Sequence, residues 1–277
     1  TVTPDKLSGG NSLTLSSAAD VAKIYVTLST EGIISCVDGI GTGNYEDLLG
    51  ATLTLANDIS LHASGVEQFT CSEKETAFRG KLIGAGHTLT LAIGENIGGE
   101  NVGIMPQDNQ RCYLGAFSAI SGATVDSLKL NGTLVYSGKV SGQVTAPVYI
   151  GGLAGLVTES VTVKESTTAM NITLRDEYTG QYSKNLYAGG FFGKVGKYAS
   201  AALSVTNSVI APVISHESGY SGGNHNAYIG GAAGSVTSSG DVIFTGNTVK
   251  TGITQTHNVT NAFVGGVFAE LTCAAYS

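Results

Sequence analysis

The sequence predicts an all-β protein: a parallel β-helix, a solenoid of stacked coils, with a short capping helix at its N-terminal end. The first observation is a recurring segment of an aromatic residue, glycines and small apolar residues, with copies that begin at Tyr113, Tyr149, Tyr187, Tyr228 and Phe263. These starts are 36, 38, 41 and 35 residues apart, and such a near-constant period is typical of repeat architectures. The second observation is that apolar and polar residues alternate between the copies, which indicates strands.

One repeat of this length cannot bury its own apolar face, whereas repeats stacked on each other can. We predict about three strands in each repeat: the glycine segment, an alternating segment such as residues 161–166, and a third strand such as residues 169–174. Coils stacked at one β-spacing, about 4.8 Å, form a parallel β-helix. The alternative is an antiparallel β-sandwich, and the scarcity of Asn-Gly turns between short strands argues against it.

Glycines stand at the same place in successive copies, at Gly152, Gly190 and Gly231. Glycine permits a tight bend or a close approach of two backbones, so we interpret these residues as structural. Asn207 and Asn247 also fall at matching places. We interpret them as an inward asparagine ladder, whose side-chain amides hydrogen-bond to one another along the axis.

Residues 1–50 are predicted to form an N-terminal cap, and residues 51–277 to form the coils. Within the cap, residues 16–26 predict a helix, because Ser16 or Ser17 can cap it and the apolar residues recur at helical spacing. A helix there would cover the apolar surface and the strand edges that a solenoid exposes at its end.

Two segments begin the coils. Residues 51–61 alternate strictly between apolar and polar and predict one strand. Residues 78–91 predict a strand, a glycine bend at Gly84 and Gly86, and a second strand.

The composition favours an extracellular solenoid. Charged residues make up 13% of the chain, about half the usual fraction near 25%. The net charge of −7 argues against nucleic acid and against anionic membrane surfaces as partners. No run of 18 apolar residues exists, so we expect no membrane insertion by this segment.

The four cysteines contain no C-x-x-C pair, which argues against the common zinc sites, and no Asp-rich cluster suggests calcium. We therefore expect no metal and no cofactor. Cys112 and Cys273 would lie four coils apart, about 19 Å, which is too far for a disulfide. Cys36 and Cys71 both lie in the N-terminal part. They either form a disulfide or stay as free thiols, and the sequence is compatible with both.

The order of these signals resembles bacterial surface proteins that carry the GLUG motif. Residues 55–61 are similar to the family's L-x-x-D-I-x-L strand, and residues 78–89 to its F-x-G-x-(I/F)-x-G-x-G-H-T-(I/L) element. The copies that start at 149, 187 and 228 are similar to its (Y/F)-(V/I/A)-G-G-(L/F)-(A/F)-G repeat. The resemblance covers about residues 11–271.

Some positions depart from the family pattern. The family usually has an Asp before the G-x-G-H-T glycine, where this chain has Leu82 and Ile83. The first copy lacks the second glycine, and the last ends in Ala269. The resemblance implies a right-handed β-helix that is secreted or attached to the bacterial cell surface, as one module of a larger adhesin-like polypeptide. It implies no catalytic residues.

The copies differ most in the segments 175–182 and 216–226, which precede the aromatic residues of the next copies by similar distances. We predict that these segments project from the same edge of the solenoid, one above the other. They carry side chains that suit stacking on sugar rings or binding a polar protein epitope: Tyr178, Tyr182, Tyr220, Asn224 and His225. The alternative is that they only cover the side of the solenoid.

We therefore expect a non-catalytic, secreted or cell-surface module of adhesin type, which binds a glycan or a protein on the surface of another cell. A polysaccharide lyase or hydrolase on the same fold is the second hypothesis. Hydrolysis needs two carboxylates about 5–9.5 Å apart, and Glu159 could approach Asp126. A purely structural stalk is the third hypothesis.

Overall fold

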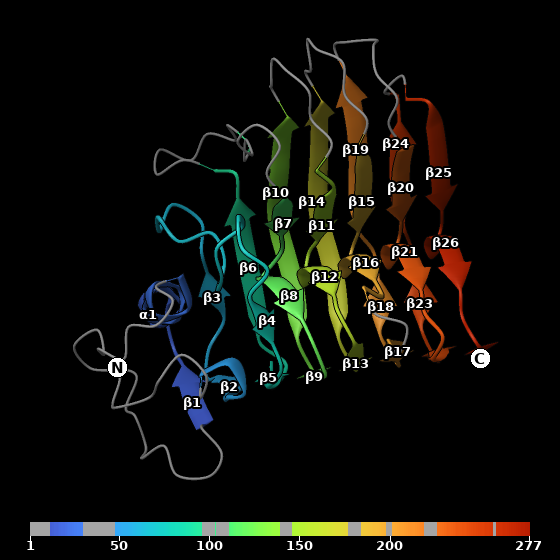
Figure 1. Cartoon of the computed structure of the whole chain (residues 1–277). Helices are drawn as coiled ribbons and strands as arrows, with labels where there is room; N and C mark the ends of the chain where they lie inside the picture. The colour runs from blue at the N-terminus through green and yellow to red at the C-terminus, as the bar shows by residue number, and fades with distance from the viewer. Residues whose placement is uncertain are drawn as a thin grey trace.

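The computed structural model is an all-β solenoid of about five turns with a short helix at its N-terminal end (Figure 1). The structure describes residues 12–29, 48–95, 103, 111–138, 146–176, 184–197, 201–218, 226–256 and 259–277. The strand pairs in these ranges are parallel, and neighbouring strands of a sheet come from successive coils. The predicted parallel β-helix is therefore confirmed, and the antiparallel β-sandwich is wrong.

The strands form four sheets, which we number in the order in which a coil visits them, starting from its aromatic residue. Sheet 1 contains β7 (Cys112–Leu114), β11 (Val148–Gly151), β15 (Asn185–Gly189), β20 (Asn226–Gly230) and β25 (Asn261–Gly265). Sheet 2 contains β4 (Ala77–Phe78), β8 (Phe117–Ile120), β12 (Ala154–Val157), β16 (Phe192–Val195), β21 (Ala233–Thr237) and β26 (Phe268–Thr272).

The other two sheets are longer. Sheet 3 contains β1 (Ser12–Leu15), β2 (Thr52–Leu55), β5 (Lys81–Ile83), β9 (Ala123–Asp126), β13 (Ser160–Lys164), β17 (Ala202–Thr206), β22 (Asp241–Thr245) and β27 (Ala275–Tyr276). Sheet 4 contains β3 (Ile59–Ser60), β6 (Thr88–Ile93), β10 (Lys129–Gly138), β14 (Thr167–Asp176), β18 (Val209–Ile210), β19 (Val213–Ser218), β23 (Thr248–Val249) and β24 (Gly252–Gln255).

The glycine segment forms two strands where one was predicted. In the second copy β11 ends at Gly151 and β12 begins at Ala154, so the chain bends at Gly152 and Leu153 between sheets 1 and 2. A coil of residues 148–176 therefore has four strands rather than about three. Residues 51–61 also form two strands, β2 and β3, because the chain turns a corner at residues 56–58.

The core consists of apolar columns that run along the solenoid axis. In β13, Val161 and Val163 are buried while the residue between them is half-buried. The strand pairing places Val161 next to Leu203 and Leu203 next to Val242, all of them buried. Burial of each such side chain contributes roughly 1.5–3 kcal/mol. Contacts between successive coils therefore contribute to the apolar stabilisation of the solenoid.

The predicted N-terminal helix is confirmed as α1 (Ala18–Ser29). The carboxylate of Asp20 accepts hydrogen bonds from the backbone N–H groups of Ser16 and Ser17, at 2.8 and 3.2 Å, and so caps the helix start. Its buried face, with Val21, Ile24 and Leu28, belongs to the main core cluster. The helix therefore packs at the N-terminal end of the coil stack, as Figure 1 shows.

The opposite end of the stack leaves apolar side chains accessible. Large apolar residues of the last coil are more than a third exposed: Phe263, Val264, Leu271 and Tyr276. The equivalent side chains of earlier coils are covered by the next coil. The four exposed residues, in contrast, belong to the last coil of the stack in Figure 1.

Candidate functional site

The five aromatic residues that mark the repeats form a continuous stack along sheet 1, which we call the aromatic column. Strand pairing aligns them in the order Tyr113, Tyr149, Tyr187, Tyr228 and Phe263. Neighbouring ring centroids are 5.3, 5.5, 4.9 and 4.7 Å apart, with interplanar angles of 15° or less. The glycines that follow, from Gly151 to Gly265, are aligned as well. The predicted stacking of the tyrosines is confirmed.

The aromatic column faces out of the solenoid and packs against sheet 2. Val148 and Ile150 point into the main core, whereas Tyr149 belongs to a separate cluster with Ala119 and Leu156 of sheet 2. Lys194 of sheet 2 lies over the ring of Tyr187, with Nζ 4.8 Å from the ring centroid. We call this outer surface between sheets 1 and 2 the crease.

Glycines allow the two sheets to meet closely at the bottom of the crease. A Cβ atom at Gly193 would lie only 2.5 Å from the backbone N of Ile150. Burial raises the pKa of Tyr187 to about 12 and also raises the pKa values of Tyr149 and Tyr228. Their hydroxyls therefore stay protonated at neutral pH and can both donate and accept hydrogen bonds.

Three strands of sheet 1 begin with an asparagine, which lies two residues before the aromatic residue of that strand. Asn261 donates to the side-chain oxygen of Asn226 at 2.9 Å, and Asn226 donates to that of Asn185 at 3.3 Å. Asn185 donates to the hydroxyl of Tyr187 at 3.1 Å. We call these residues the asparagine ladder. The sequence analysis missed them, although the constant offset from the aromatic residue is a signal that the sequence carries.

The predicted asparagine ladder of Asn207 and Asn247 is wrong, because the two residues are not aligned. Strand pairing places Thr206 beside Thr245 and Val209 beside Thr248, so Asn247 is opposite Ser208. Asn207 is exposed and adopts a left-handed conformation with φ of 50°. Its place in the next coil is taken by Gly246, also with a positive φ.

The interior ladder at this corner consists of serines and ends in Asn247. The N–H of Leu128 donates to Oγ of Ser166 at 3.1 Å, and the N–H of Ser166 donates to Oγ of Ser208 at 3.1 Å. The N–H of Ser208 in turn donates to Oδ1 of Asn247 at 2.8 Å. These bonds satisfy buried backbone donors where the chain turns from sheet 3 to sheet 4.

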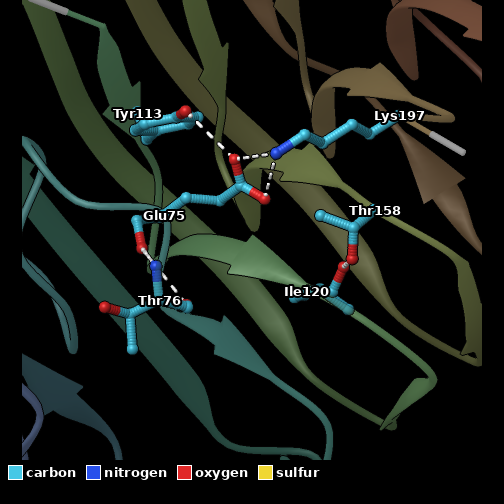
Figure 2. Close-up of polar contacts among 7 residues, drawn as sticks. Glu75, Thr76, Tyr113, Ile120, Thr158 and Lys197 are labelled. Atoms are coloured by element: carbon cyan, nitrogen blue, oxygen red, sulfur yellow. Dashed lines mark hydrogen bonds and ion pairs between the residues drawn. The ribbon is translucent and has the colours of Figure 1, made fainter.

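The segment before β4 is fixed against the first part of the crease, as Figure 2 shows. The carboxylate of Glu75 accepts a hydrogen bond from the hydroxyl of Tyr113 at 3.2 Å and pairs with Nζ of Lys197 at 2.7 and 2.9 Å. The N–H of Thr76 donates to the hydroxyl of Ser118, which donates back to the carbonyl oxygen of Thr76. Tyr113 is consequently only 2% exposed, whereas Tyr149 and Tyr228 are half-buried.

The predicted ligand-binding residues lie outside the described residues: Tyr178, Tyr182, Tyr220, Asn224 and His225. The structure does describe the strands on both sides of the two segments. β14 and β19 pair in register up to Asp176 and Ser218, and β15 and β20 pair in register from Asn185 and Asn226. The two segments therefore leave and rejoin the solenoid at the same edge, one coil above the other.

The carboxylates considered for hydrolysis do not fit that chemistry. Asp126 lies opposite Lys164 and forms an ion pair with it, with Nζ 2.8 Å from Oδ2. Glu159 is five residues before Lys164, which corresponds to about 16 Å along the strand direction. A hydrolytic pair is separated by about 5–9.5 Å, so these two residues are too far apart.

The cysteines in the described part of the chain are free thiols: Cys71, Cys112 and Cys273. Cys112 and Cys273 are unpaired, as their predicted separation required. Cys71 is free as well, and Cys36, considered as its disulfide partner, lies outside the described residues. Burial raises the pKa of Cys112 to about 12, which leaves little of the reactive thiolate.

The described residues contain no group of three His, Cys, Asp or Glu side chains that could hold a metal ion. They also contain no helix long and apolar enough to cross a membrane.

Comparisons of this chain with protein-family models, with curated proteins and with solved structures find no match. The resemblance to GLUG-motif proteins therefore stays a prediction, and the geometry of the chain's own residues carries the functional interpretation.

Proposed function

We propose that the chain is a non-catalytic recognition module of adhesin type, secreted or attached to a bacterial cell surface, that binds a glycan or a protein on another cell. One observation carries this proposal. The two variable segments, 175–182 and 216–226, join the scaffold at the same edge, because β14 pairs in register with β19 and β15 pairs in register with β20. Loops on a rigid scaffold are where binding residues concentrate.

The described surface beside this edge supports recognition of a polar ligand. The asparagine ladder begins at the edge, where Asn226 and Asn261 repeat the same amide one coil apart. Tyrosine hydroxyls of the aromatic column follow two residues later in β15 and β20, at Tyr187 and Tyr228, whereas β25 carries Phe263 at this place. Such a regular row of donors and acceptors matches an extended ligand whose polar groups also repeat, as a polysaccharide does.

The test measures binding to a glycan array and to intact cells with two double variants, Tyr178→Ala with Tyr182→Ala and Tyr220→Ala with His225→Ala. We expect both to keep the circular dichroism spectrum and melting temperature of the wild type and to lose at least tenfold in affinity. The matched control is Tyr276→Ala, because Tyr276 is 54% exposed at the far end of the stack. It should leave binding unchanged.

Three results would contradict the proposal. If the wild type binds but both double variants bind equally well, recognition does not use this edge. If the wild type binds no glycan and no cell, the structural-stalk hypothesis is favoured. Release of reducing sugar from a polysaccharide would instead favour an enzyme.

A further inference from the structure

A pocket of about 630 Å³ lies at the N-terminal end of the solenoid. It is bounded by α1, by the segment that follows β3 and by the end of β6. Apolar atoms of Leu61, Val66 and Ala92 form part of its wall. The polar side chains that line it are Tyr25, Glu67, Gln68, Ser72 and Glu95.

Two buried side chains in this wall have oxygen atoms without a hydrogen-bond partner among the described residues. Gln68 is 3% exposed, and its Nε2 donates to the carbonyl oxygen of Thr70, which fixes the orientation of the amide and leaves Oε1 unpaired. The carboxylate of Glu95 is also buried, and neither of its oxygens accepts a hydrogen bond. Nδ1 of His62 lies 2.9 Å from Oε1 of Glu95, on an imidazole that is 63% exposed, and the two form an ion pair only when this ring is protonated.

A second carboxylate adds to the negative charge of the same wall. Oε1 of Glu67 accepts a long hydrogen bond of 3.3 Å from the N–H of Gly94. Burial raises the pKa of Glu67, and the Gly94 N–H opposes this shift only in part. Two buried or half-buried carboxylates and an unpaired amide oxygen thus line one pocket, and a buried carboxylate that has few hydrogen-bond donors is unfavourable.

We propose that this pocket binds a small organic cation through a protonated primary amine. An ammonium group offers three hydrogen-bond donors and no acceptor, which complements Glu67, Gln68 and Glu95. The apolar wall residues and the ring of Tyr25 provide contacts for the body of the ligand. A bare metal ion fits less well, because the volume is that of a small-molecule site and the described residues hold no group of three metal-binding side chains.

An amino sugar and an aliphatic polyamine share this chemistry, and they can be distinguished with simple probes. The experiment measures heat of binding and melting temperature of the full chain with glucosamine and with cadaverine. Glucose and 1-pentanol serve as their uncharged counterparts, and calcium chloride tests the metal. We expect one or both amines to bind and raise the melting temperature, while the uncharged counterparts and calcium do not. The amine that binds more tightly shows whether the natural ligand is an amino sugar or an aliphatic polyamine.

Two isosteric variants test the residues. Glu95→Gln and Glu67→Gln should each weaken amine binding at least tenfold. Without ligand, Glu95→Gln should keep or raise the melting temperature, because a neutral amide is less unfavourable in this pocket than a buried carboxylate that accepts no hydrogen bond from the described residues. The matched control is Glu159→Gln, which removes the same charge from an exposed position and should leave binding unchanged.

Three results would overturn the inference. Amines and their uncharged counterparts could have equal effects, or Glu159→Gln could weaken binding as much as Glu95→Gln, which would indicate a non-specific charge effect. Alternatively, Glu95→Gln could lower the melting temperature without ligand and leave amine binding intact, which would show that Glu95 has a structural role. The inference does not depend on the recognition function proposed for the variable segments.

Discussion

At the scale of single residues, glycine determines how closely two coils approach. A Cβ atom at Gly190 would lie 2.5 Å from the carbonyl oxygen of Gly231 and 2.8 Å from Cγ of Pro212. The φ of Gly190 is not in the left-handed region, so the requirement comes from space rather than from backbone conformation. Neither the carbonyl of Gly231, which accepts a hydrogen bond from the N–H of Gly190, nor a proline ring can move aside easily.

The first prediction compares two glycines at the same place in different coils. Gly190→Ala should lower the free energy of unfolding by about 1–3 kcal/mol, because the added methyl group forces neighbouring coils apart. Gly266 occupies the equivalent place in the last coil, where no described atom lies within 4 Å of the added Cβ. Gly266→Ala should therefore change the free energy of unfolding by no more than about 0.5 kcal/mol. Urea denaturation measures both, and equal effects would contradict the assignment of Gly190 to close backbone approach.

At the scale of elements, the corner between sheets 3 and 4 uses two adjacent positions for different purposes. The first position adopts a left-handed conformation in successive coils, with φ of 52° at Ser127, 50° at Glu165 and 50° at Asn207. The second position, from Ser166 on, points inward and accepts a hydrogen bond from a backbone N–H of the previous coil. The corner therefore depends on both backbone conformation and an interior hydrogen-bond acceptor.

The second prediction tests the interior acceptor. Ser208 is 2% exposed, accepts from the N–H of Ser166 and donates to the carbonyl oxygen of Thr206. Ser208→Ala should lower the free energy of unfolding by about 1–3 kcal/mol, because it leaves a buried N–H unpaired. Ser204→Ala, on the same chain segment but half-buried, is the control and should change it by less than about 0.5 kcal/mol. A Ser208→Ala protein that is as stable as the Ser204→Ala control would contradict the stabilising role of the interior ladder of serines.

At the scale of the whole molecule, most contacts join neighbouring coils, but the Glu75–Lys197 pair reaches further. Glu75 precedes β4 and Lys197 follows β16, and these strands are three spacings apart in sheet 2, about 14 Å. The pair thus joins the N-terminal coils to the middle of the stack. Its side chains are 21% and 34% exposed, so solvent and salt weaken the attraction.

The third prediction concerns this long-range pair. Lys197→Met should lower the free energy of unfolding by about 1 kcal/mol at most at low salt, which is the usual contribution of a partly exposed ion pair. The difference from the wild type should shrink in concentrated salt, since screening removes it. Lys250→Met, at an exposed position of a later coil, should show no such salt dependence. If the free energy of unfolding depended on salt in the same way for both variants, the Glu75–Lys197 ion pair would not stabilise the contact between distant coils.

The sequence by itself determined the repeat, and with it the fold class. The aromatic residues at near-constant spacing align in the structure from Tyr113 to Phe263, and the alternating segments pair in register as at Val161 and Leu203. The capping helix was also predictable, because its spacing of apolar residues is local. These features follow from the periodicity of side chains along one chain, which a sequence displays directly.

Only the tertiary structure decided the number of strands in a coil and the register at its corners. The bend inside the glycine segment leaves no mark in polarity, because both of its halves are buried. A one-residue difference in spacing aligned Asn247 with Ser208 instead of Asn207. The N-terminal pocket and the Glu75–Lys197 pair join residues from different coils, whose proximity depends on how the coils stack. A single sequence records the order of residues along the chain, whereas packing between coils fixes which of them meet.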